Sequence, residues 1–202
     1  MFMINLLLLV LAYVIGMIPN AYILGLFMDK DKLAHVRSDL VGAYKVLINI
    51  KKPEFFMTLL LDFLKGALLV SLTLLFETWV FLPMLLILIA MIARNFNVFI
   101  GFRNGVGIAI LMGGMLIYAP WFILIYLILV LIIAPFINDL DAALAMATIV
   151  IPLGSALMIQ AVHSVLIGIM IVAVVFVQKI VYTNAAAFRT KYSDYKRGNP
   201  FV

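Results

Sequence analysis

Long apolar runs separated by short polar breaks dominate the chain. A helix that crosses a membrane needs about 20 consecutive, mostly apolar residues. Seven runs match or approach that length, so the pattern predicts an all-α, polytopic membrane helix bundle with about seven transmembrane helices. The runs cover residues 3–28, 55–76, 79–93, 107–119, 121–137, 142–160 and 162–182.

The fourth and fifth runs leave one alternative open, because only Pro120 separates them. They can form two crossings, or one long helix that is kinked at the proline. A single helix would be about 45 Å long at ~1.5 Å per residue, against a hydrocarbon core of about 30 Å. Seven crossings also agree better with the distribution of charge.

Lysine and arginine outside the apolar runs gather in three segments, residues 29–54, 94–106 and 183–202. With seven crossings all three segments lie on one face, which the positive-inside rule identifies as cytoplasmic. The pattern therefore predicts an external N-terminus and a cytoplasmic C-terminus. It divides the chain into one transmembrane domain, residues 1–182, and a cytoplasmic tail, residues 183–202.

Composition supports a bilayer as the main solvent. Hydrophobic residues make up 67% of the chain and charged residues 11%, with a mean hydropathy of +1.27, whereas a soluble domain is nearer half apolar. The net charge of +5 indicates membrane lipid headgroups and phosphorylated small molecules as partners, rather than nucleic acid. We therefore expect a multi-pass protein of the cell membrane, and the sequence names no protein partner.

The residue inventory excludes several kinds of site. There is no cysteine and there are two histidines, so disulfide frameworks, thiolate chemistry and histidine-rich metal sites are excluded. We expect neither a metal nor a cofactor.

Two charged residues, Asp62 and Lys65, lie inside the second run. At a spacing of three residues they share one helix face. Charges at such depth are costly, and by default they mark a functional site. An internal ion pair that fixes packing explains them equally well, and both interpretations can hold together.

A glycine-rich turn, Gly101 to Gly107, opens the fourth run from the predicted cytoplasmic side. Glycines let backbone N–H groups approach an anion, and a helix N-terminus favours one. Arg103 adds a forked donor that suits phosphate. Close helix packing through small residues is the structural alternative, and it is the expected role of Gly113 and Gly114 within the following helix.

Two further residues suggest chemistry less strongly. Ser38 lies three residues after His35 in the first polar segment, and a serine near a histidine can indicate a nucleophile. His163 starts the seventh run, where we expect an interfacial or packed side chain.

Four stretches together resemble the acyl-phosphate-dependent glycerol-3-phosphate acyltransferase family (PlsY) of bacterial membranes. Tyr13 to Pro19 is similar to the family's Y-x-I-G-S-I-P, and Arg37 to Ile48 to its G-S-G-N-I-G-A-T-N-V-L-R. Asp62 to Gly66 reproduces its D-x-x-K-G. Ala93 to Ile110 is similar to its G-H-x-F-P-V-F-L-x-F-K-G-G-K-G-V-A-T.

The resemblance implies a seven-helix enzyme with a cytoplasmic active site. It implies transfer of an acyl group from acyl phosphate to glycerol 3-phosphate, which makes lysophosphatidic acid for phospholipid synthesis. The implied catalytic residues are Ser38, Lys65 and Asp62, with Asp62 orienting Lys65. The phosphate-binding residues expected in the glycine-rich turn are Arg103, Asn104, Gly105 and Gly107, and Lys45 and Arg94 are candidate phosphate-binding cations at positions that depart from the family pattern.

The chain also departs from the family pattern, and the departures leave a second hypothesis open. In this hypothesis the chain is a catalytically degenerate relative that keeps the family's scaffold, and it acts as a regulator or partner subunit that binds lipid or phosphate. Lys45 and Arg94 are cations that can compensate for the lost groups. The family's polar residues and its proline are replaced by Met17, Leu40, Lys45, Ile48, Arg94, Asn97, Val106, Thr183 and Ala186.

Overall fold

The structure is a computed structural model that describes residues 2–20, 23, 53–76, 78–95, 107–137, 140–158 and 162–196. Every regular element in these ranges is an α-helix. The helices are α1 (Phe2–Met17), α5 (Pro53–Thr73), α6 (Leu82–Asn95), α7 (Ile108–Tyr118), α8 (Pro120–Ile137), α9 (Leu140–Ala147), α10 (Val150–Met158) and α11 (Val162–Lys196).

Each of the seven predicted apolar runs contains helix, although α1 ends at Met17, before Pro19, and not at the end of the first run. Three spans are long and apolar enough to cross a membrane by length and composition, and four shorter apolar helices accompany them. The fourth shorter helix, Ala142–Gly154, takes in most of α9 and the first part of α10, which meet at a turn around Thr148. The long spans are Phe56–Thr73, Pro120–Ile137 and Val162–Val181, and the other short helices are Phe2–Met17, Leu82–Asn95 and Ile108–Tyr118.

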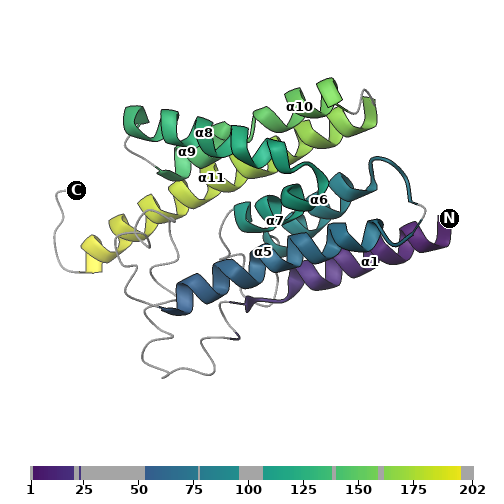
Figure 1. The fold of residues 1–202 in the computed structure, drawn as a ribbon. Helices are drawn as coiled ribbons and strands as arrows, with labels where there is room; N and C mark the ends of the chain where they lie inside the picture. Colours follow the sequence, from purple (N-terminus) through teal and green to yellow (C-terminus); the bar gives the residue numbers. More distant parts are fainter. Residues whose placement is uncertain are drawn as a thin grey trace.

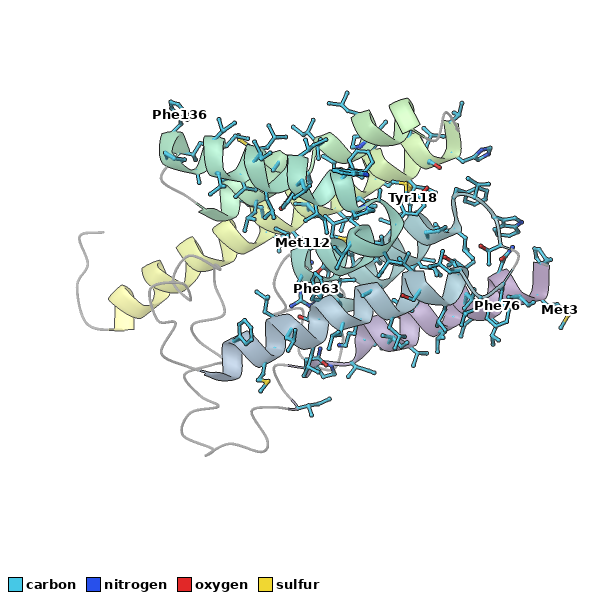
Figure 2. The ribbon with its side chains drawn as sticks, in the orientation of Figure 1. Met3, Phe63, Phe76, Met112, Tyr118 and Phe136 are labelled. Atoms are coloured by element: carbon cyan, nitrogen blue, oxygen red, sulfur yellow. The ribbon has the colours of Figure 1, made fainter. Side chains whose placement is uncertain are left out.

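The outside of the bundle is apolar, as a lipid-facing surface requires. Large hydrophobic side chains lie exposed along α1, α5, α8 and α11. Met3 and Phe136 are 82% and 84% exposed and point outward at opposite ends of the view in Figure 2. A surface of this kind would drive aggregation in water, and in a bilayer it contacts acyl chains.

The break at Pro120 separates two helices rather than kinking one. Ala119 leaves helical geometry, with φ −156° and ψ 79°, and α8 then turns back along α7. Ile108, at the start of α7, packs against the cluster that contains Val130 of α8. In one continuous helix these residues would be about 33 Å apart, so the two-crossing prediction is confirmed.

Helices α1, α5, α6 and α7 form one half of the bundle, and α8 to α11 form the other (Figure 1). The main buried core joins both halves, because α6 residues such as Leu86 and Ile87 share a cluster with Ile171 and Val175 of α11. Helix α6 therefore sits centrally, and its last turn is held by neighbours on several sides.

Helix α11 extends past the predicted transmembrane boundary. The apolar span ends at Val181, but the helix continues to Lys196, through most of the segment predicted to be the tail. Figure 1 shows that α1 begins and α11 ends at opposite ends of the bundle. This arrangement fits termini on opposite sides of the membrane, while the identity of the cytoplasmic face stays a prediction from the charge bias.

Candidate functional site

A buried polar cluster joins the ends of α1 and α6 to the middle of α5. Its centre is Asp62, which is 2% exposed. The Nδ2 group of Asn20 donates to Oδ1 of Asp62 at 2.9 Å, and Nη2 of Arg94 lies 2.6 Å from Oδ2. The Nζ atom of Lys65 lies 3.6 Å from Oδ1. The predicted Asp62–Lys65 pair therefore exists, and two further residues complete it.

Lys65 has a second partner at the end of α1. Its Nζ donates to the carbonyl oxygen of Ile18 at 2.6 Å, and the backbone N–H of Asn20 donates to the same oxygen at 3.1 Å. Helix α1 ends here because Pro19 lacks the N–H that a continuing helix needs. Lys65 thus places a positive charge at a helix C-terminus, where the helix dipole favours it.

Glycines allow the helices that form this cluster to approach closely. A Cβ atom on Gly66 would overlap the carbonyl oxygen of Ile110, and one on Gly113 would overlap the carbonyl oxygen of Phe63. Figure 2 shows Phe63 on the side of α5 that faces α7. The predicted packing role of Gly113 is confirmed. The same contact fixes the position of α7 along α5, and so its position relative to Asp62 and Lys65.

The N-terminus of α7 lies beside Arg94. Gly107 precedes the helix in the left-handed conformation, with φ 77° and ψ 12°, and no side chain of the described residues caps the helix. A point one Cβ bond from its Cα lies 3.7 Å from Nη1 of Arg94 and 3.7 Å from Oδ1 of Asn95. One nitrogen of the Arg94 guanidinium therefore binds Asp62 while the other faces the start of α7.

The charges of this cluster favour an anion. Asp62 contributes one negative charge, and Lys65 and Arg94 contribute two positive charges. Their side chains are 3%, 11% and 16% exposed, so water screens them weakly. The unpaired N–H groups of a helix N-terminus add to the attraction. Among the described residues, no group of three or more His, Asp or Glu side chains could hold a metal ion.

The structure brings together four of the predicted site residues: Asp62, Lys65, Arg94 and Gly107. The other five, Ser38, Lys45, Arg103, Asn104 and Gly105, lie outside the described residues. His163 belongs to the opposite end of the bundle, where its ring stacks on Phe81 with centroids 5.3 Å apart, as expected of a packed histidine.

Sequence reasoning missed two asparagines that the structure places here, Asn20 and Asn95. Both are buried, at 8% and 1% exposure. Each directly follows a residue that the motifs did single out, Pro19 or Arg94. A polar amide at the end of an apolar helix, or just beyond it, was the available signal.

Gly107 provides a first test of this geometry. Gly107→Ala forces a residue with a Cβ atom into the left-handed region, although the nearest described atom beyond its chain neighbours is 3.5 Å from the new methyl. We expect a loss of about 1–2 kcal/mol in the free energy of unfolding, measured by thermal denaturation in detergent. Gly107→Asn should lose less, because asparagine tolerates this conformation; equal losses would contradict the conformational explanation.

Comparisons with known proteins agree with the motif pattern. The family model described as glycerol-3-phosphate acyltransferase matches residues 6–186. The glycerol-3-phosphate acyltransferase of Enterococcus faecalis is 29% identical over 144 residues, which cover 71% of this chain and 66% of the relative. A Streptococcus pneumoniae protein of the same description is 31% identical over 122 residues, 60% of this chain and 57% of the relative. The chain spans about two thirds or less of the length of these curated relatives.

The fold also matches a solved structure. A crystal structure of PlsY (YgiH), an integral membrane glycerol 3-phosphate acyltransferase in its glycerol 3-phosphate form, superposes with a TM-score of 0.67. The match covers 96% of this chain and 93% of the crystallised one at 22% identity. The lysophosphatidic acid form matches equally well.

The shared fold and the seven apolar helical segments make this a multi-pass membrane protein. Because the family model extends over most of the chain, the protein belongs to the glycerol-3-phosphate acyltransferase family.

Proposed function

We propose that this protein is a membrane acyltransferase of phospholipid synthesis that transfers an acyl group from acyl phosphate to glycerol 3-phosphate. The observation that carries the proposal is the cationic cluster of Lys65 and Arg94 around Asp62, next to the uncapped N-terminus of α7. Both proposed substrates present a phosphate, and a buried site with excess positive charge selects such a group.

The reaction needs little from the protein beyond positioning and charge. A hydroxyl oxygen of glycerol 3-phosphate attacks the acyl carbonyl carbon, and the bond from that carbon to the phosphate oxygen breaks. Lysophosphatidic acid and inorganic phosphate are the products, and the released phosphate takes up the hydroxyl proton. Negative charge grows on the leaving phosphate, so fixed cations near it lower the barrier.

Lys65 and Arg94 suit this role because both are held by other partners. The Lys65 ammonium has three N–H donors; one binds the carbonyl oxygen of Ile18 and one faces Asp62, which leaves a third for a phosphate oxygen. Asp62 orients both cations and does not itself contact the substrate. In the proposed site Ser38 binds the reacting oxygens, and Lys45, Arg103, Asn104 and Gly105 complete the phosphate contacts.

The direct test supplies purified protein in detergent with acyl phosphate and labelled glycerol 3-phosphate, and counts lysophosphatidic acid. We expect product from the parent protein. Lys65→Ala should lower the rate about 10- to 100-fold, the effect of one hydrogen bond to a charged group, and Ser38→Ala should also lower it.

His163→Phe is the matched control, because it keeps an aromatic ring against Phe81 at the other end of the bundle. Its rate should equal that of the parent. A folded parent protein that makes no product would refute the transfer reaction and favour the degenerate relative that binds lipid or phosphate without turnover.

A further inference from the structure

Asn95 is a buried side chain whose polar atoms have no partner. It is the last residue of α6 and is 1% exposed. In the described part of the chain, neither Oδ1 nor Nδ2 of Asn95 has a hydrogen-bond partner. Buried amides are nearly always paired, because an unpaired one loses its bonds to water and gains nothing. An orphaned amide at this depth therefore calls for a physical explanation.

The position of this amide supplies the explanation. Its Oδ1 atom lies 3.7 Å from the point where a Cβ on Gly107 would sit, the same distance as Nη1 of Arg94. Apart from the chain neighbours of Gly107, the nearest heavy atom of the described residues to that point is Cγ of Met91 at 3.5 Å. An amide and a guanidinium thus both lie within contact distance of the position that a side chain on Gly107 would take, at the start of α7.

The backbone at this point also has donors to offer. Helix α7 has 11 residues and no side-chain cap. Its first hydrogen bonds inside the helix come from the N–H groups of Ile110 and Leu111, both to the carbonyl oxygen of Gly107. The N–H groups of the residues before them lack partners within the helix, as at any helix N-terminus, so an anion here would meet backbone, amide and guanidinium donors together.

We propose that Asn95 binds the substrate phosphate, its side-chain NH₂ group donating to a phosphate oxygen held at the N-terminus of α7. The inference rests on the proposed function and adds a residue to its site. Neither Oδ1 nor Nδ2 makes a hydrogen bond to the described residues. A half-turn about the Cβ–Cγ bond of Asn95 therefore presents Nδ2 in place of Oδ1 and breaks no such hydrogen bond. A bound phosphate thus gives Asn95 a hydrogen bond that none of the described residues supplies.

A second buried asparagine makes a matched control. Asn5 in α1 is 0% exposed, and both of its side-chain polar atoms also lack partners. It lies eleven residues before Gly16, whose Cα faces Ala90 and Ala93 of α6, or about 16 Å along the helix. Asn5 and Asn95 therefore share burial and chemistry but differ in their distance from the cationic cluster.

The experiment compares Asn95→Leu and Asn5→Leu in the full-length protein in detergent. Leucine has nearly the shape of asparagine and removes an unpaired buried amide, so both variants should melt at or above the temperature of the parent. Titration calorimetry with inorganic phosphate measures the dissociation constant. It should rise about 10-fold or more for Asn95→Leu and stay at the parental value for Asn5→Leu. If Asn95→Leu fails to fold, Asn95→Ala gives the same comparison.

Parental phosphate affinity in the folded Asn95 variant would overturn the proposal, as would a parent protein that binds no phosphate. A parent that binds phosphate but makes no lysophosphatidic acid would refute the transfer reaction alone, and the calorimetric comparison would still decide the role of Asn95. The Michaelis constants then identify the ligand. A rise confined to acyl phosphate assigns the amide to the donor, and a rise confined to glycerol 3-phosphate assigns it to the acceptor.

Discussion

Replacing Asp62 by alanine is expected to lower the free energy of unfolding by about 3–5 kcal/mol, the cost of breaking a buried ion pair by removing one partner. Asp62 is the only anion in the described cluster, and Lys65 and Arg94 both contact it. Without it, two largely buried cations face each other and Asn20 loses its acceptor. Thermal denaturation in detergent, followed by the fluorescence of Trp79 and Trp121, measures the loss.

A double substitution separates the charge from the packing. Asp62→Ala combined with Arg94→Leu removes the closest pair together, and it leaves Lys65 on the carbonyl oxygen of Ile18. Because the buried guanidinium is removed together with the carboxylate that balances its charge, we expect the double variant to be more stable than Asp62→Ala alone. The single variant Arg94→Leu completes the comparison. If the losses in the free energy of unfolding for Asp62→Ala and Arg94→Leu simply add in the double variant, the 2.6 Å contact between Arg94 and Asp62 is not what stabilises this junction.

This junction shows what the sequence could and could not predict. The three-residue spacing of Asp62 and Lys65 sufficed to place both on one helix face, because that geometry is local to α5. The contact of Arg94 with Asp62 joins residues 32 positions apart in the chain, and it depends on how α6 packs against α5. No periodicity in the sequence encodes such a contact, so the sequence predicts for Arg94 a role in binding phosphate and no contact with Asp62.

The helices themselves were predictable for a similar reason. Their apolar runs and proline breaks are local signals, and the boundaries of α7 and α8 at Pro120 follow from proline chemistry. The length of α11 was not predictable from hydropathy, because the polar segment after Val181 still forms helix up to Lys196. Hydropathy reports the solvent around a helix, whereas backbone hydrogen bonds can continue a helix from an apolar into an aqueous solvent.

The packing of Gly66 carries the other large expected effect. A methyl group at this position would overlap the carbonyl oxygen of Ile110 and come within 2.8 Å of the Gly114 nitrogen. Both are backbone atoms of α7, so no side chain can rotate away, and the two helices must separate. For Gly66→Ala we expect a loss of about 3 kcal/mol or more in the free energy of unfolding, at the upper end of the cost of overpacking.

The same displacement should abolish phosphate binding, because it carries Gly107 away from Lys65 and Arg94. Gly113→Ala tests the contact from the other helix, where a methyl would overlap the carbonyl oxygen of Phe63, and it should behave like Gly66→Ala. Gly168→Ala is the matched control in α11, since its methyl would meet Pro152 at 3.0 Å or more and needs only a small shift. If Gly66→Ala has the same melting temperature as Gly168→Ala and still binds phosphate, the close contact of α5 and α7 does not set the geometry of the site.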